Sequence, residues 1–267
     1  MTNYFNRLEM AGVAVAFLGW PPNLAHVGPP LIADDPNTVG PGVVQPIFAV
    51  SAFSQGDETL VLGPTADVTI RLVDSLDATL IATLASLHDV TGNPRWTLSG
   101  LLAMGAKWEF FRRKRGSLCF SPAFVIDTAE PKRSGILLPV QGELAVGRGK
   151  AVVGFDVGYV VQQRQGHQWF VALCMNWTAT RRLNVLGELW AVSFGQTGPT
   201  ELGEPIGTDF GTSIGIDYGI IGNELRLLAA VGTGIVSLSA GRIDIRAYLG
   251  TQFTFGTRRD RWRSTRP

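Results

Sequence analysis

The sequence predicts an all-β protein, a transmembrane antiparallel β-barrel of about twelve strands of the bacterial outer-membrane type. Apolar residues make up 45% of the 267 residues and charged residues only 17%, whereas a soluble domain carries about a quarter charged residues. No run of about eighteen apolar residues is present to form a membrane helix. From Val43 onward, short segments of alternating polarity follow one another, each closed by turn residues.

About twelve segments carry this pattern, mostly with lengths near those of tilted membrane strands. The predicted strands are 43–53, 66–73, 78–87, 96–112, 117–125, 137–146, 151–162, 168–178, 183–194, 210–220, 225–237 and 243–255. With both termini on the periplasmic side, tight turns gather there, and the longer connections fall on the other side. These are 88–95, 127–135 and 196–209.

The two faces of each segment differ in size as well as polarity. In 210–220, large residues such as Ile214 and Ile216 alternate with small or polar ones such as Ser213 and Asp217. A soluble sandwich also alternates, but its outer face meets water and carries long charged side chains. A large apolar face suits lipid, and a face rich in glycine and serine suits a narrow lumen.

Aromatic residues recur at a spacing that fits two membrane interfaces. Trp169 and Trp177 lie eight residues apart on one face, as do Phe210 and Tyr218. Eight strand residues rise roughly 26 Å, and tilting brings this near the ~25 Å apolar band between aromatic girdles. The expected lipid-interface residues, which make outer-membrane lipid a partner, are Trp108, Trp169, Trp177, Phe210, Tyr218 and Phe255.

The chain divides into four predicted parts. Arg7 precedes a short apolar stretch typical of a secretory signal peptide, although a buried or disordered N-terminal arm is the alternative. The parts are a signal peptide (1–27), a periplasmic segment (28–42), the barrel (43–255) and a basic tail (256–267). The tail is either an arm for acidic partners or phosphate groups, or a solvated extension, which terminal basic runs often are.

Ionisable residues are expected in the lumen. The inward candidates are Asp67, Arg71, Lys107, Glu109, Glu143, Asp156, Glu188, Asp217, Arg226, Asp244 and Arg246. They either line a polar path for a solute or form an ion-pair network that fills the barrel, and the mixed signs favour the network. Cys119 and Cys174 are also expected to face inward without forming a disulfide.

Several classes of function are disfavoured. The net charge of +1 argues against a nucleic-acid partner. The sequence has no CxxC, no Cys/His cluster and no GxSxG, so we expect no metal site, no cofactor and no enzymatic activity.

Several stretches resemble a family of outer-membrane transporters linked to the meta-pathway of phenol degradation. They are residues 28–36, 105–110, 115–118, 121–122 and 248–255. The resemblance implies that Tyr248 to Phe255 form the terminal-strand signal read by the barrel-insertion machinery. The signal usually ends a protein, but here Phe255 is followed by residues 256–267.

The leading hypothesis is an outer-membrane barrel for passive uptake or export of small organic solutes. That the solute is aromatic or apolar is implied by the resemblance alone. The alternatives are a non-transporting structural or adhesive barrel and a soluble all-β binding domain.

Overall fold

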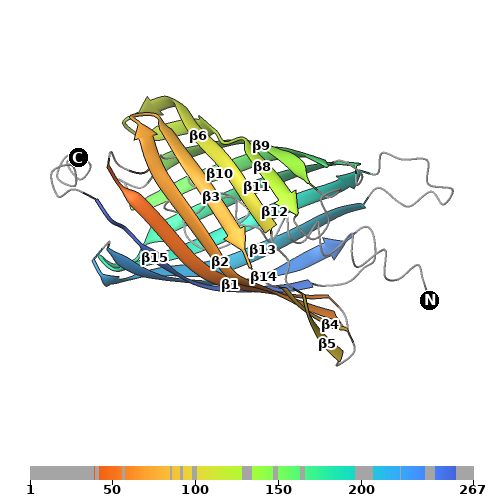
Figure 1. Ribbon diagram of the computed structural model, residues 1–267. Coiled ribbons are helices and arrows are strands. Elements are labelled where there is room, and N and C mark those ends of the chain that lie inside the picture. Colours follow the sequence, from red (N-terminus) through yellow and green to blue (C-terminus); the bar gives the residue numbers. More distant parts are fainter. Residues whose placement is uncertain are drawn as a thin grey trace.

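The computed structural model is a closed antiparallel β-barrel of twelve strands, which confirms the predicted fold class (Figure 1). It describes residues 39, 42–55, 58–84, 86–90, 93–97, 101–127, 134–146, 150–162, 166–195, 207–222, 224–237 and 244–256. In this part of the chain, no helix is long and apolar enough to cross a membrane. The predicted signal peptide and nearly all of the tail lie outside the described residues.

The strand segments follow one another along the chain. They are β1 (Val44–Gln55), β2 (Glu58–Val73), β3 (Leu76–Thr83), β4 (Ser86–Val90), β5 (Asn93–Thr97), β6 (Leu101–Arg113), β7 (Gly116–Phe120), β8 (Ala123–Asp127), β9 (Gly135–Val146), β10 (Ala151–Gln162), β11 (Gly166–Thr178), β12 (Leu183–Gly195), β13 (Gly207–Ile221), β14 (Leu225–Ser237) and β15 (Asp244–Phe253).

Fifteen segments make twelve strands because three strands are interrupted. β7 and β8 pair with the same two neighbours, β6 and β9, on either side of Ser121 and Pro122. β3 and β4 both pair with β2, while β5 pairs with β4 and β6 with β3. The barrel closes where β1 pairs with both β2 and β15.

The sequence reading placed the start of the second strand at Ala66, but β2 begins at Glu58. Gly63 and Pro64 look like a strand end, because proline lacks an N–H for the ladder. They form an irregularity inside the strand instead. Gly63 has a φ of 148°, and the pairing with β1 shifts register opposite it, between Ala49 and Ser51.

The long connection predicted over 88–95 is also corrected. These residues lie almost wholly in the β4–β5 hairpin, which continues the sheet beyond the rest of the barrel (Figure 1). The other two long connections are confirmed in length, because β8 ends at Asp127 and β9 begins at Gly135, and β12 ends at Gly195 and β13 begins at Gly207.

The predicted tight turns are confirmed. Turns of two to four residues join β2 to β3, β6 to β7, β9 to β10, β11 to β12 and β13 to β14. All lie at the end of the barrel where β1 begins and β15 ends, next to the Val44–Phe255 bridge. We call this the turn end. It is the periplasmic end in the usual orientation of such barrels, which have short periplasmic turns and longer extracellular loops.

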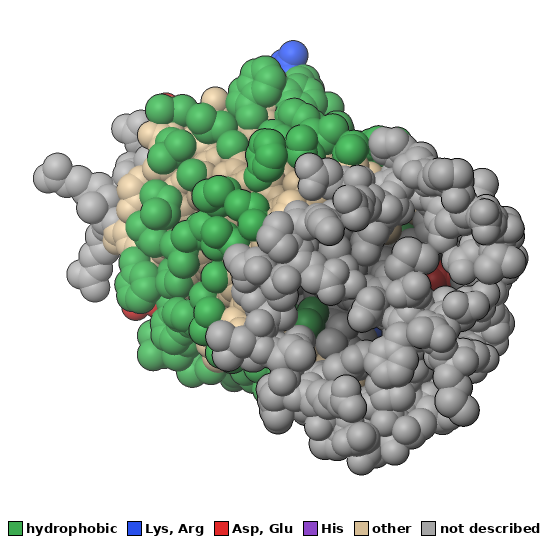
Figure 2. All heavy atoms as spheres, turned by 45° about the vertical axis from the view of Figure 1, so that its right-hand side comes forward, with side chains coloured by type: hydrophobic (Ala, Val, Ile, Leu, Met, Phe, Trp, Pro, Cys, Tyr) green, Lys and Arg blue, Asp and Glu red, His purple; other side chains and the backbone are tan. Residues whose placement is uncertain are grey.

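Side chains alternate between the outer and inner faces as predicted. Along β13, Phe210, Ile214, Ile216, Tyr218 and Ile220 are exposed, and the residues between them are buried or half-buried. Apolar side chains cover much of the outer wall (Figure 2). An exposed apolar surface this extensive is unstable in water, but it is the expected outer surface of a barrel in a bilayer.

Candidate functional site in the barrel lumen

Most of the predicted lumen residues are withdrawn from the outer surface. Lys107, Glu109, Asp156, Glu188 and Asp217 are buried, as is Asp67. The half-buried ones are Arg71, Glu143, Arg226 and Arg246. Asp244 is the first residue of β15, but its side chain lies outside what the structure describes. The lumen therefore holds charges of both signs.

Two of the predicted residues form an ion pair near the turn end. The guanidinium of Arg226 on β14 donates to the carboxylate of Asp217 on β13, with Nη2 2.6 Å from Oδ2 and Nε 2.5 Å from Oδ1. The side-chain amide of Asn184 on β12 donates to the same Oδ2 at 3.3 Å. The side chain of Arg226 is 12% exposed and that of Asp217 is 5% exposed, so this ion pair is largely shielded from water.

A second charged group centres on Asp77, which lies between two predicted strands, 66–73 and 78–87, and was expected in a turn. Its side chain is fully buried, and Arg71 Nε lies 3.6 Å from its Oδ1. Lys107 on β6 stands opposite it in the register. The backbone N–H of Val39 donates to Oδ2 of Asp77 at 2.7 Å. The alternation of side chains along the strand could have identified Asp77, because Asp77, Thr79 and Ile81 occupy every second position and share the inner face.

Glu109 and Arg112 lie at the same end of the barrel. The Arg112 guanidinium makes a bidentate contact with the Glu109 carboxylate. A register shift between Glu109 and Phe111 sends Phe110 and Phe111 outward together, which brings Arg112 back to the inner side with Glu109. Glu109 is thus paired to an exposed arginine at the rim of the barrel.

Neutral polar side chains of β7 and β9 connect to Asp156 on the neighbouring strand β10. Gln141 donates from Nε2 to Oδ2 of Asp156 at 3.1 Å, and its Oε1 accepts from Ser121 Oγ at 3.0 Å and from Cys119 Sγ at 2.9 Å. Cys119 and Cys174 are buried and unbonded to each other, as predicted. In the described residues no group of three His, Cys, Asp or Glu side chains could hold a metal ion.

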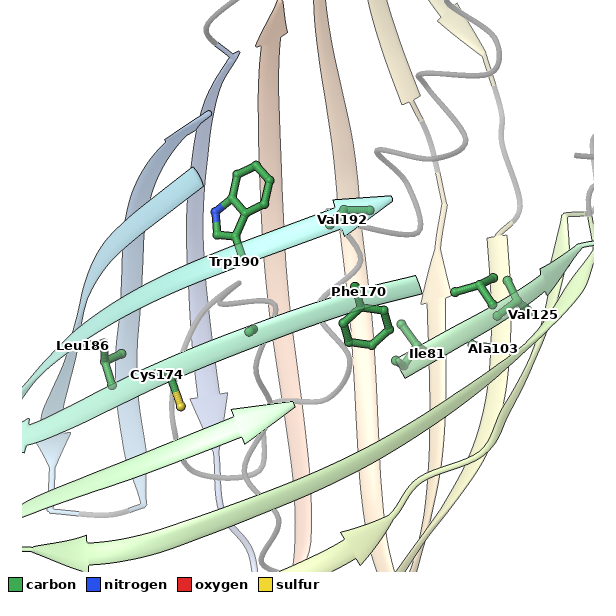
Figure 3. Close-up of a cluster of buried hydrophobic side chains, with 10 residues drawn as sticks. Ile81, Ala103, Val125, Phe170, Cys174, Leu186, Trp190 and Val192 are labelled. Atoms are coloured by element: carbon green, nitrogen blue, oxygen red, sulfur yellow. The ribbon is translucent and has the colours of Figure 1, made fainter. Parts of the chain in front are cut away.

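The inner wall also carries large apolar side chains, which the sequence reading missed. The cluster comprises Ile81, Ala103, Val125, Val160, Phe170, Ala172, Cys174, Leu186, Trp190 and Val192, with Leu137 packed against it (Figure 3). We call it the apolar wall. Most of its members lie toward the end opposite the turn end, on β3, β6 and β8 to β12.

Glycines make room for the two inward aromatic rings of the apolar wall. Phe170 stands opposite Gly158 in the register, and a Cβ at Gly158 would lie 2.2 Å from two of its ring carbons. Trp190 stands opposite Gly211, where a Cβ would lie 2.0 Å from an indole carbon. The guanidinium carbon of Arg246 lies 3.9 Å from the Trp190 ring centroid, a cation–π contact.

The predicted interface aromatics all lie on the outer surface, exposed by 40% to 58%. Trp108, Trp177, Tyr218 and Phe255 are near the turn end, and Trp169 and Phe210 are near the other. Further rings extend the first group, since Trp108 contacts Phe110, and Phe253 stacks on Phe255.

A closed barrel with an apolar outer face, two aromatic levels and charged side chains in its lumen is a transmembrane β-barrel of the outer membrane. No family model matches the chain, and no curated protein is similar to it in sequence. Solved structures do resemble it. The COG4313 outer membrane channel from Pseudomonas putida F1 has a TM-score of 0.62 at 11% identity, over 83% of this chain and 98% of that one.

Two further structures give similar values. The translocator domain of the autotransporter NalP from Neisseria meningitidis has a TM-score of 0.59 at 11% identity, covering 94% of this chain and 97% of its own. The KdgM porin has a TM-score of 0.55 at 11% identity, covering 78% and 99%. At these identities the likeness is one of fold.

Proposed function

We propose that this barrel provides a passive route across the outer membrane for small organic solutes that are aromatic or apolar in part. One observation carries the choice of solute, the apolar wall. The lumen of a water-filled barrel is normally polar. Here Ile81, Ala103, Val125, Phe170 and Val192 turn apolar surface inward.

The arrangement divides the lumen into two parts with different chemistry. Ile81, Ala103 and Val125 are consecutive neighbours across three strands, and Phe170 stands opposite Val192. A solute with an apolar group gains free energy by covering such a surface, at about 25 cal/mol per Å² removed from water. The charged groups at Asp77 and Asp217 lie nearer the turn end. A purely apolar molecule therefore meets a favourable wall first and a polar region second.

The resemblance to transporters linked to phenol degradation agrees with such a solute, and the channel and porin structures above have the same fold. The alternative is a barrel that transports nothing. It is supported by the two shielded carboxylates, Asp77 and Asp217, because their contacts with Arg71 and Arg226 join neighbouring strands and stiffen the turn end. Transport measurements separate the two functions.

The test is liposome swelling with a matched pair of solutes, phenyl β-glucoside and methyl β-glucoside. We expect the wild-type barrel to admit the phenyl compound faster than its size alone allows. Phe170→Ser combined with Val192→Ser removes apolar surface from the wall and lowers the phenyl-to-methyl ratio. Val171→Thr, on the other face of β11, is the control and leaves the ratio unchanged.

Three outcomes decide the matter. No swelling with either solute supports the non-transporting barrel. Equal entry of both solutes in wild type and in the double variant supports an unselective pore and overturns the choice of solute. Loss of the phenyl preference only in the double variant supports the proposed route along the apolar wall.

A further inference from the structure

Six exposed cations lie together on the turn end, and they have no part in the lumen site or in the proposed transport. Arg113 ends β6, Lys114 and Arg115 form the β6–β7 turn, the β9–β10 turn carries Lys150, and the β11–β12 turn carries Arg181 and Arg182. All six are exposed. We call this set the basic arc.

The arc occupies one side of the barrel. Strands β6, β7, β9, β10, β11 and β12 are consecutive in the sheet, so their three turns are neighbours along the rim. The exposed acidic residues described at this end, Asp74 and Glu224, lie on the β2–β3 and β13–β14 turns, outside the arc. The cations are therefore concentrated and face no carboxylate on their own turns among the described residues.

Aromatic residues place the arc at the level of lipid head groups. Exposed Trp108, Phe110 and Phe111 lie on β6 just before the first turn, and Trp177 lies on β11 just before the third. The guanidinium carbon of Arg113 lies 5.7 Å from the Phe111 ring centroid. Tryptophan rings mark the boundary between hydrocarbon and head groups. The cations of the arc are on the turns that follow these aromatic residues, so they lie at the level of the lipid phosphates.

We propose that the basic arc is a docking surface for the phosphate head groups of anionic phospholipids in the periplasmic leaflet. An anionic membrane surface attracts each nearby lysine or arginine, with about a fivefold gain in binding per cation. Because the arc lies on one side of the barrel, anionic lipids would gather on that side. This binding does not depend on the proposed transport.

The test uses the purified barrel in bilayers of phosphatidylcholine that contain brominated lipid, which quenches nearby tryptophans. Trp108 and Trp177 lie next to the arc and report on the lipids there. We expect brominated phosphatidylglycerol to quench more than brominated phosphatidylcholine, with a relative binding constant of about five or more. High salt should reduce the difference, because it screens exposed charges.

Variants assign the preference to the arc. Arg113→Ser, Lys114→Ser and Arg115→Ser in combination should bring the binding ratio toward one, and Arg181→Ser with Arg182→Ser should lower it independently. The control removes three cations that lie between β8 and β9 or between β10 and β11 in the sequence, as Lys132→Ser, Arg133→Ser and Arg164→Ser. It removes as many charges as the triple arc variant and should keep the wild-type ratio.

Folding of each variant is checked by the gel shift of the unheated barrel, so that a misfolded protein is not counted as a lipid effect. A wild-type ratio near one would overturn the proposal and would point to an acidic periplasmic protein as the partner of the arc. An equal loss in the control would also overturn it, since the preference would then follow total charge. Loss only in the two arc variants supports it.

Discussion

The backbone N–H of Val39 donates a 2.7 Å hydrogen bond to Asp77, a carboxylate with no exposed surface on the inner side of β3. Val39 itself is 1% exposed. The residue thus lies inside the turn end, five positions before β1 begins at Val44. The sequence predicts a periplasmic segment over residues 28–42, and in that segment Val39 is one of two residues that the structure describes.

Asp77→Asn should destabilise the barrel. The change removes the negative charge that lies beside Arg71 and opposite Lys107, while it keeps the size of the side chain. Breaking a buried ion pair by removing one partner costs about 3–5 kcal/mol. Urea unfolding in liposomes measures the loss. Asp74→Asn, on the exposed turn nearby, is the control, and we expect a change within about 0.5 kcal/mol there.

Arg226→Ala should also lower the free energy of unfolding, by about 3–5 kcal/mol, because it leaves Asp217 shielded without its ion-pair partner. If a wide watery channel passes this pair, the loss falls to about 1 kcal/mol or less, as for exposed pairs. Ion selectivity would shift instead. Unfolding and planar-bilayer conductance, measured on the same variant, distinguish these cases. Arg246→Ala is measured for comparison. Arg246 is another lumen arginine, and it contacts the Trp190 ring.

Neighbouring residues on β13 test the lipid face. Ile214 is 60% exposed on the outer wall, and Ser213 is 7% exposed on the inner wall. Arginine on the lipid face near mid-membrane costs about 2–4 kcal/mol. Ile214→Arg should therefore reduce folding into liposomes far more than Ser213→Arg. Similar folding yields for the two variants would be inconsistent with a bilayer around this strand.

Alternation and turn chemistry predicted the strands well where both were regular. Along β10, β13 and β15, large apolar residues alternate with small or polar ones, and the structure follows that parity. The prediction was wrong at Gly63 and Pro64, where a local break in the strand resembles its end. It was also wrong over 88–95, because polar residues in a projecting hairpin look like a loop.

The lumen was harder to predict for a physical reason. Each inward side chain depends on what stands across from it, and that partner comes from the register of another strand. Trp190 fits because Gly211 is opposite, and Phe170 fits because Gly158 is opposite. A single strand read alone shows a glycine on one face but does not show which ring covers it.

Gly211→Ala and Gly158→Ala should each displace the ring that covers the glycine. The new methyl group would lie 2.0 Å from a carbon of Trp190 in the first case and 2.2 Å from two carbons of Phe170 in the second. Overpacking of this kind costs about 1–3 kcal/mol. We expect that loss in urea unfolding, together with a changed fluorescence spectrum for Gly211→Ala, because the indole of Trp190 must shift and its contact with Arg246 must change.

Gly187→Ala on β12 is the matched control, since a Cβ there meets no atom within 4 Å. Alanine also limits the unfolded chain more than glycine does, so this variant should be neutral or slightly more stable. Trp190→Leu in the Gly211→Ala background should recover part of the lost stability, because a smaller side chain leaves room for the methyl group. If the effects of the two substitutions on the free energy of unfolding simply add, the ring does not rest on Gly211. The small size of Gly211 would then not explain how Trp190 fits inside the barrel.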